Sequence, residues 1–411
     1  MTKEEKSWIL YDWANSAFVV TIVTAVLPIY FKDVVANELP SSHSTAYWGY
    51  INTIIALIVA ASSPILGSLA DYKDNKKKFL FFLVVMGTLS CSLLSIVGEG
   101  DIILCLIIYM FAGISYFTAN IFYDSLLVDV TEENKMDWIS SNGFAWGYIG
   151  STIPFILSIA IILKPSLIGL ASKTAATRVS FIITGLWWFI FSIPIFINVK
   201  QKHFVEKSSQ NFKGSFRRLY NTFSTIKNNT NIFLFLLAYF FYIDGVSTIF
   251  KMASVYGRDI GIESNQLLLI LLVTQFAAFP FAILFGKLAG IWSTKKMLLV
   301  GIAIYFFISI YAFFIKTVFD YWILAILVAT CQGGIQALSR SMYCKMIPKE
   351  MSSSYFGIYN IIGKFSAIIG PLMIGVISQL TKNSRYGIIS LVVLFLLGFV
   401  LLKKVQINSQ N

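Results

Sequence analysis

The chain has 411 residues, of which 57% are apolar and 13% are charged, and its formal net charge is +12. Because soluble proteins carry about 25% charged residues, this composition excludes an ordinary soluble domain and indicates an integral membrane protein. The Lys and Arg residues lie mostly in short segments between apolar runs. No basic face on a soluble domain is expected, which excludes a nucleic-acid-binding protein.

The first half of the chain carries six apolar runs of membrane-spanning length. A helix needs about 20 such residues to cross about 30 Å of hydrocarbon. Asp12 and Asn15 interrupt the first run. We therefore predict a retained first helix rather than a cleaved signal peptide. The six predicted spans are 9–31, 46–70, 79–97, 102–122, 140–163 and 176–197.

A basic loop at 198–230 follows the sixth span. It separates a predicted N-terminal bundle, 1–197, from a predicted C-terminal bundle, 231–411. Within the loop, four apolar residues recur at helical spacing beside basic residues. This pattern predicts either a short helix on the membrane surface or a flexible linker. The four are Phe216, Leu219, Phe223 and Ile226.

The second half repeats the pattern of the first, with predicted spans at 231–250, 266–291, 297–315, 321–338, 354–380 and 387–402. The fold class expected is an all-α membrane protein, with twelve transmembrane helices in two pseudo-symmetric six-helix bundles. Of the 32 Lys and Arg residues, 22 lie on the side that holds the N-terminus and nine on the other. Positive charge marks the cytoplasmic side, so both termini are predicted to be cytoplasmic.

The loop after the second span reads Gly67-Ser-Leu-Ala-Asp71 and continues into a Lys cluster. It resembles the signature loop of the major facilitator superfamily. A glycine here permits close helix approach, and Asp71 can cap or bridge to a helix end. The alternative is a plain basic loop. The matching stretch of the second half has Gly290 in place of the acid, so only the first half is expected to make a charged latch. The repeat itself supports two related bundles.

Further motifs narrow the match. Together they resemble the vacuole-effluxer branch of the major facilitator superfamily, from Trp8 to about Pro371, without the long insertions of its fungal members. The resemblance implies transport of a small solute, with neutral amino acids as the leading class. The motifs are Tyr11-Asp-Trp-Ala-Asn-Ser16, Phe122-Tyr-Asp124, Gly143-Phe-Ala-Trp-Gly147, Tyr242-Ile-Asp-Gly-Val246 and Gln332-Gly-Gly-Ile-Gln-Ala-Leu-Ser-Arg-Ser341.

Ionisable residues inside spans are costly and usually functional. Asp12 is shallow and lies one turn from Asn15, so it serves either a helix-end structural role or the pathway and gate. Asp244 is deeper, about 20 Å into its span by helical rise, and is expected to line the central cavity. Lys364 lies near mid-bilayer and needs a carboxylate partner or an anionic ligand. Asp244 is the candidate partner. Two alternatives stay open: a permanent ion pair with Asp244 that braces the second bundle, and a functional role in which Lys364 holds a substrate carboxylate or is displaced by it.

The remaining polar candidates form a pathway and a gate. Asn120, Gln336 and Asn360 complete the predicted substrate or proton pathway, which also includes Asp12, Asn15, Asp244 and Lys364. Asp124 closes the fourth span and Arg340 the tenth, so they could bridge the two bundles. Simple interfacial charges are the alternative. Together with Gly67 and Asp71, this pair forms the predicted cytoplasmic gate.

The sequence shows no catalytic constellation, no metal-ligand pattern and no phosphate-binding loop, so no enzyme activity and no cofactor are expected. The predicted function is secondary active transport by alternating access, with protons as the candidate coupling ion. Two alternatives are a lipid or lysolipid flippase and a non-transporting sensor or scaffold. The expected partners are a small-molecule substrate and the lipid bilayer. A monomer in the inner membrane of a bacterium is expected.

Overall fold

The computed structural model describes residues 1–206, 221–366 and 368–406, and these are almost entirely helical. Within them, twelve helical segments are long and apolar enough to cross a membrane. The predicted number of spans is confirmed. Many of the observed spans extend beyond the predicted apolar runs at one or both ends, as in the first span, which covers Lys3–Val35.

In the first half, the first span is built from four consecutive helical segments and the others from one main helix each. The segments are α1 (Lys3–Phe18), a π-helical stretch (Val19–Ala25), α2 (Val26–Tyr30), a second π-helical stretch (Phe31–Val35), α3 (Ser41–Ala70), α4 (Asn75–Leu93), α5 (Ile102–Ser125), the short α6 (Leu127–Val130), α7 (Met136–Leu163) and α8 (Lys173–Asn198).

In the second half, the fifth and sixth spans are each divided into two helices. The helices are α10 (Thr230–Asp259), α11 (Ser264–Trp292), α12 (Thr294–Phe314), α13 (Val318–Met346), α14 (Ser352–Ser366), α15 (Ile369–Thr381), α16 (Ser384–Ile389) and α17 (Val392–Lys404).

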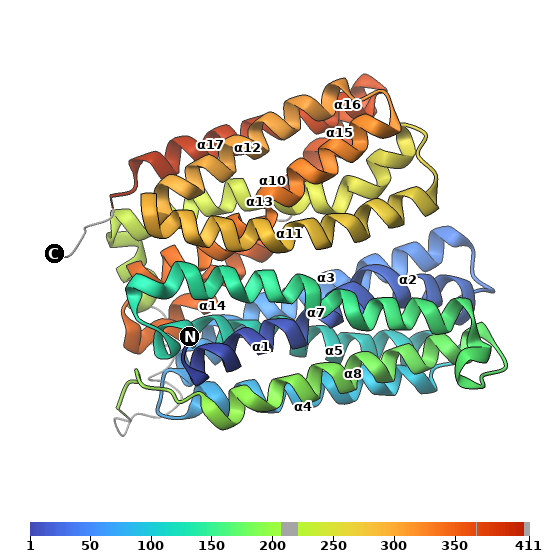
Figure 1. Cartoon of the computed structure of the whole chain (residues 1–411), viewed down its shortest axis with the longest axis horizontal. Helices are drawn as coiled ribbons and strands as arrows, with labels where there is room; N and C mark the ends of the chain where they lie inside the picture. The colour runs from blue at the N-terminus through green and yellow to red at the C-terminus, as the bar shows by residue number, and fades with distance from the viewer. Residues whose placement is uncertain (207–220, 367, 407–411) are drawn as a thin grey trace.

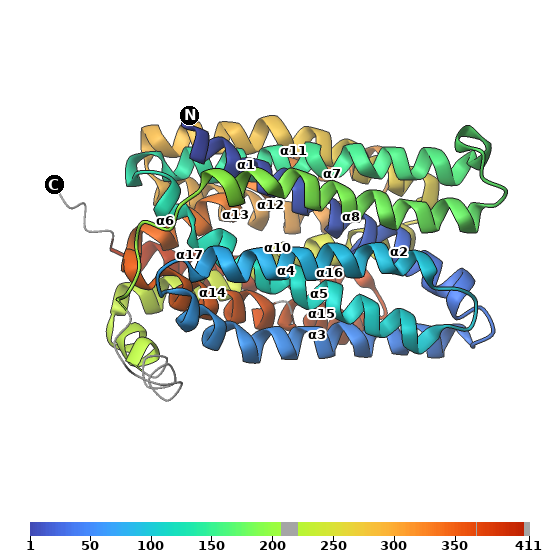
Figure 2. The same cartoon turned by 90° about the horizontal axis from the view of Figure 1, so that it is seen from below.

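The two halves form two bundles that lie one above the other, and both chain termini lie at the same end of the molecule (Figures 1 and 2). We call this the termini end and the opposite one the far end. The bundles touch chiefly through α3 against α14 and through α7 against α11, with α7 also contacting α13. These helices therefore surround the space between the halves.

The burial pattern suits a lipid solvent. Large apolar side chains such as Leu89, Phe111 and Phe307 are exposed on the outside, whereas small polar ones such as Ser63 and Thr184 are buried between helices. Because lipid tails are as apolar as leucine, helices in a bilayer associate through close packing and polar contacts rather than through hydrophobic burial.

Two spans are interrupted where they border the central space. Val19–Ala25 is wound as a π-helix, an uncommon geometry that often occurs at functional sites. The eleventh span breaks between Ser366 and Ile369. The sequence analysis did not predict either irregularity, since both segments read as uniform apolar runs.

The basic loop begins as an extended strap on the first bundle, where the Val205 N–H donates to the Asp71 carbonyl at 2.8 Å. Further along, residues 221–228 are helical, with Ile226 buried and Phe223 exposed. The predicted surface helix also included Phe216 and Leu219, which lie outside the described residues. That prediction therefore stays open.

Candidate transport cavity and gate

A cavity of about 660 Å³ lies between the two bundles. This volume falls within the range of small-molecule sites. Both halves line it, and its wall includes apolar, aromatic, amide and charged side chains. Six of the residues predicted for the pathway and gate contribute to the wall: Asn120, Asp124, Gln336, Arg340, Asn360 and Lys364.

Arg340 closes the cavity toward the termini end. Its guanidinium Nη1 lies 2.8 Å from Asp124 Oδ1, and Nη2 lies 3.4 Å from Asp12 Oδ2. Arg340 also donates to the Ser140 hydroxyl and carbonyl oxygens at 2.9 and 3.0 Å. One side chain of the second bundle thus ties together three helices of the first. The Asp124–Arg340 contact that the sequence predicted is present.

The Arg340 cluster is almost dry. The Arg340 side chain is 4% exposed and lies over the ring of Trp8, 4.6 Å from its centroid. The Tyr123 hydroxyl donates to Asp12 Oδ2 at 2.9 Å. A Cβ on Gly143 would lie 2.6 Å from that same oxygen, so only glycine leaves room for the carboxylate. Two carboxylates share one guanidinium, which leaves one negative charge in excess when both are ionised.

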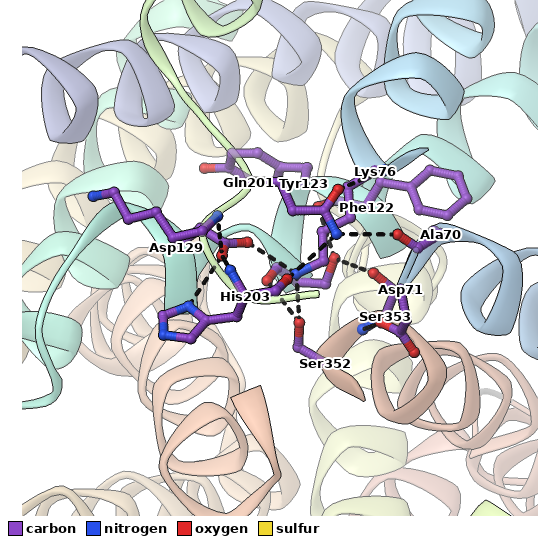
Figure 3. Close-up of polar contacts among 12 residues, drawn as sticks. Ala70, Asp71, Lys76, Phe122, Tyr123, Asp129, Gln201, His203, Ser352 and Ser353 are labelled. Carbon is purple, nitrogen blue, oxygen red and sulfur yellow. Dashed lines mark hydrogen bonds and ion pairs between the residues drawn. The ribbon is translucent and has the colours of Figure 1, made fainter. Parts of the chain in front are cut away.

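Asp71 makes a second connection between the bundles, shown in Figure 3. Its carboxylate accepts the backbone N–H groups of Ser353 and Ser354, at 2.8 and 3.1 Å, and the Ser354 hydroxyl. These groups belong to the first turn of α14, where unpaired N–H groups and the helix dipole favour an anion. Burial raises the pKa of Asp71 to about 6, although Lys76 and the hydrogen bonds oppose this shift.

Gly67 explains how α3 and α14 come so close. A Cβ at this position would collide with the Ser353 carbonyl oxygen, which is backbone and cannot rotate away. A second close approach occurs about one turn away, where a Cβ on Gly357 would lie 2.7 Å from the Ser63 carbonyl oxygen. The sequence analysis placed Gly67 in the gate for this reason, and the structure has it at the contact between the bundles.

Beside Asp71 lies a buried ion pair that the sequence analysis missed. Lys76 Nζ is 2.9 Å from Asp129 Oδ2 and donates to the Ser352 hydroxyl at 2.8 Å, with both charged side chains fully buried (Figure 3). The other Asp129 oxygen accepts the backbone N–H groups of Lys202 and His203. The strap is thereby anchored to the same cluster as the gate. An acid at the boundary of the fourth span was the available signal.

A further ion pair joins α7 to the second bundle. Asp137 Oδ2 lies 2.7 Å from Lys345 Nζ and accepts the Thr294 hydroxyl at 2.7 Å, while Oδ1 accepts the Ser341 hydroxyl. The prediction that only the first half makes a charged latch, because Gly290 replaces the acid, concerns the two repeated loops, and the acid of this further contact also belongs to the first half. Asp137, the acid of this contact, lies on α7. It is across the interface from the second-half loop that carries Gly290 in place of an acid.

Asp244 differs from its prediction. It is fully buried and is not among the residues that line the cavity. Its carboxylate accepts the Gly370 N–H at 2.8 and 3.0 Å and the Thr248 hydroxyl at 3.3 Å. The side chain therefore faces the break of the eleventh span and caps the start of α15, whose first N–H groups have no helical partner. Its predicted part in a substrate or proton pathway stays a prediction.

Lys364 lines the cavity without the predicted partner. Among the described residues, no ion pair includes Lys364, and its ammonium lies 3.0 Å from the centroid of the Phe117 ring. The proposed structural pair with Asp244 is not formed, because the Asp244 carboxylate is occupied at the helix break. Lys251, one helix away on α10, also lines the cavity.

Asn15 lies behind the wall. It is buried, and its amide donates to the side-chain oxygen of Asn120 at 2.9 Å. Asn120 itself reaches the cavity. Asp12, also predicted for the pathway, is bound into the Arg340 cluster one turn away. Within the described part of the chain, no group of His, Cys, Asp and Glu is arranged to hold a metal ion.

Two six-helix bundles around a central cavity define a transporter of the major facilitator superfamily. Solved structures with this fold include the proton:xylose symporter XylE, at 13% identity and a TM-score of 0.73, covering 98% of this chain and 95% of that one. Another is FucP in its outward conformation, at 13% identity and a TM-score of 0.73, covering 99% of this chain and 98% of that one. At these identities the likeness shows the fold alone.

Sequence relatives identify the branch. The model of the family described as vacuole effluxer Atg22 like matches residues 35–136 and 128–411, and the chain belongs to this family. An uncharacterized MFS-type transporter of Bacillus subtilis, YxiO, is 49% identical over 98% of this chain and 94% of its own length. Autophagy-related protein 22 of Saccharomyces cerevisiae is 22% identical over 98% of this chain and 91% of its own length. These relatives and structural neighbours are transporters, not enzymes.

Proposed function

We propose that this multi-pass membrane protein moves a small solute by alternating access, in which the two bundles rock about the central cavity. The single observation that carries the proposal is the cavity itself, because charged contacts between the bundles close it at the termini end. Arg340 links Asp12 and Asp124 across the bundles, and Asp71 holds the start of α14. Opening at this end requires these contacts to break.

The termini end is proposed to be cytoplasmic, because 22 of the 32 basic residues lie on that side. The structure then corresponds to a state closed toward the cytoplasm. The bacterial relative supports the inner membrane of a bacterium as the location. A monomer is sufficient, since one chain provides both bundles and the whole cavity wall.

Family membership supports neutral amino acids as the first solutes to test. Proton coupling is proposed through the Arg340 cluster, where two carboxylates face one guanidinium and a proton can neutralise the excess charge. Asp12 and Asp124 are the candidate proton carriers. Protonation of either one would weaken the contact with Arg340 and so link proton binding to gate opening.

The test is transport by the purified chain in proteoliposomes, under an imposed pH gradient, with a panel of amino acids, peptides, sugars and lysolipids. Solute accumulation that collapses with a protonophore is the expected result. The Asp124→Asn variant is expected to lose this dependence, while Lys316→Gln, at an exposed loop position, is expected to keep it. Flux without pH dependence would reject coupling. Lysolipid movement alone would indicate a flippase, and binding without flux a sensor.

A further inference from the structure

The cavity wall carries an uneven set of charges. Its cations are Lys251, Arg340 and Lys364, whereas Asp124 is its only acid among the described residues. Arg340 and Asp124 neutralise each other at 2.8 Å. Lys251 also interacts with Asp244, so Lys364 is the positive charge of this wall that faces a solute.

Lys364 is the cation best placed to meet a ligand. Lys364 is partly exposed and lines the cavity, about 18 Å from the start of α14 by helical rise. A cation at such a depth needs an anionic partner or a water-filled space. The carboxylates of the two nearest candidates are already used, Asp124 by Arg340 and Asp244 by the Gly370 N–H.

In place of a carboxylate, Lys364 faces the ring of Phe117 at 3.0 Å from its centroid. A cation–π contact is worth about 0.5–2 kcal/mol, less than a desolvated ion pair of good geometry. An anion entering the cavity could therefore displace the ring. Lys251 is a second positive charge close enough to act on Lys364, so it adds to the attraction of this region for an anion. It also interacts with Asp244, so its own charge is partly balanced.

The rest of the wall suits an apolar body. Tyr116, Phe117, Tyr239, Tyr359 and Phe365 line the cavity together with aliphatic side chains. A zwitterionic amino acid would place its ammonium in a wall whose only acid is already paired. We propose that the solute of this cavity is an organic anion, with one carboxylate or phosphate held by Lys364 and an apolar body held by the aromatic wall. The proposal rests on the transport function proposed above and replaces neutral amino acids by organic anions as the expected substrate class.

The experiment measures ligand-induced thermal stabilisation of the full chain, because a ligand that binds the native state raises its apparent stability. The probes share one body and differ in charge: 3-phenylpropanoate, phenylalanine and phenethylamine, with an alkyl series of the same three charges. Lysophosphatidate and lysophosphatidylcholine distinguish a lipid source of the anion from a soluble one. The anionic members are expected to bind at least tenfold more tightly than their zwitterionic and cationic counterparts.

Three variants locate the effect. Lys364→Gln is expected to weaken anion binding about tenfold or more, whereas Lys364→Arg keeps the charge and is expected to retain most of it. Asn360→Asp places a carboxylate one turn before Lys364 and is expected to weaken anion binding by pairing with the lysine. Lys316→Gln, an exposed loop lysine, is the matched control and should bind like the unmodified chain.

Two outcomes would overturn the proposal: anions that bind no better than the matched zwitterions, or anion binding that Lys364→Gln leaves unchanged. Amino-acid flux in proteoliposomes together with either outcome would reject the anion proposal and leave the transport function standing. Flux of no tested solute would reject the transport function itself, whichever probe binds.

Discussion

The two bundles meet at the termini end through two interfaces that the internal repeat relates, and these interfaces use different chemistry. In the first, α3 meets α14, and the fully buried Asp71 accepts backbone N–H groups. In the second, α11 meets α7, and beside this contact Asp137 of α7 pairs with Lys345 of α13, whose side chain is 17% exposed. The close helix approach is common to both, since a Cβ on Gly286 would lie 2.5 Å from Ser141. The charged contacts differ between the two interfaces.

The two repeated interfaces therefore share their close helix packing, but different polar contacts hold them together. The first interface is dry and its hydrogen bonds are directed at fixed backbone groups, so small changes should weaken it strongly. The second depends on a partly exposed ion pair and on hydroxyl groups that can rotate. Exposed ion pairs contribute little and are screened by salt. We therefore expect the first interface to control opening.

The largest effect is expected between the two interfaces, at Arg340→Gln. Removing the guanidinium leaves the buried Asp12 and the partly exposed Asp124 without a counter-charge, which costs about 3–5 kcal/mol. Thermal unfolding in detergent should shift downward. The cavity should also open to the cytoplasm, measured by thiol labelling of Gln336→Cys in inside-out vesicles. The four native cysteines are buried and give a low background.

The matched control for this experiment is Lys345→Gln in the second interface, which should lower stability less than Arg340→Gln does, because it leaves one carboxylate rather than two without a counter-charge. Adding Asp124→Asn to Arg340→Gln should restore part of the loss, because one buried charge is then removed. Equal losses for Arg340→Gln and Lys345→Gln would contradict the ranking of the two sites.

Gly67→Ala should separate α3 from α14. The new methyl group meets the Ser353 carbonyl oxygen, so the helices must move apart at a cost of about 1–3 kcal/mol. Labelling from the cytoplasmic side should rise. Gly290→Ala is the control from the matching loop of the second half, because no heavy atom lies within 4 Å of its added Cβ. A labelling increase for Gly290→Ala of similar size would argue against steric closure at Gly67.

The variants Asp71→Asn and Asp137→Asn compare the polar contacts of the two interfaces directly. Asparagine at position 71 replaces one acceptor oxygen by an NH2 group and leaves a buried N–H of α14 unpaired, at a cost of about 1–3 kcal/mol. Asp137→Asn should cost about 1 kcal/mol, and 0.5 M salt should reduce the difference from the unmodified chain. The measurement is again labelling of Gln336→Cys. A larger increase in labelling for Asp137→Asn than for Asp71→Asn would contradict the expectation that the first interface controls opening.

The smallest effect expected is a pH dependence of the first interface. Burial raises the pKa of Asp71 to about 6 in the closed state, whereas an open, hydrated carboxyl has a pKa of about 3.9. The closed state therefore binds a proton more tightly between these values. Acidification from pH 6 toward pH 4 should favour closure, and this stabilisation should be lost as the pH rises through 6. Labelling at graded cytoplasmic pH checks it, and Asp71→Asn should remove that component.

The sequence by itself determined the membrane class, the twelve spans and the two related halves. Apolar run length and loop charge are local properties, and lipid leaves a chain few ways to satisfy its backbone groups. The loop at Gly67–Asp71 and the ends of the fourth and tenth spans were also readable, because charged residues are easily located at the ends of long apolar runs. Gly67, Asp71, Asp124 and Arg340 all lie at contacts between the bundles.

Only the tertiary structure decided which charges meet. Asp244 and Lys364 are both deep in the second half, yet one caps the break of the eleventh span and the other faces the cavity. The direction of each side chain depends on helix rotation and on the break itself, and neither can be read from hydropathy. The pairing of Asp137 with Lys345 joins residues 208 positions apart. Spacing along the chain carries no information about such a contact, because it forms only when the two bundles pack.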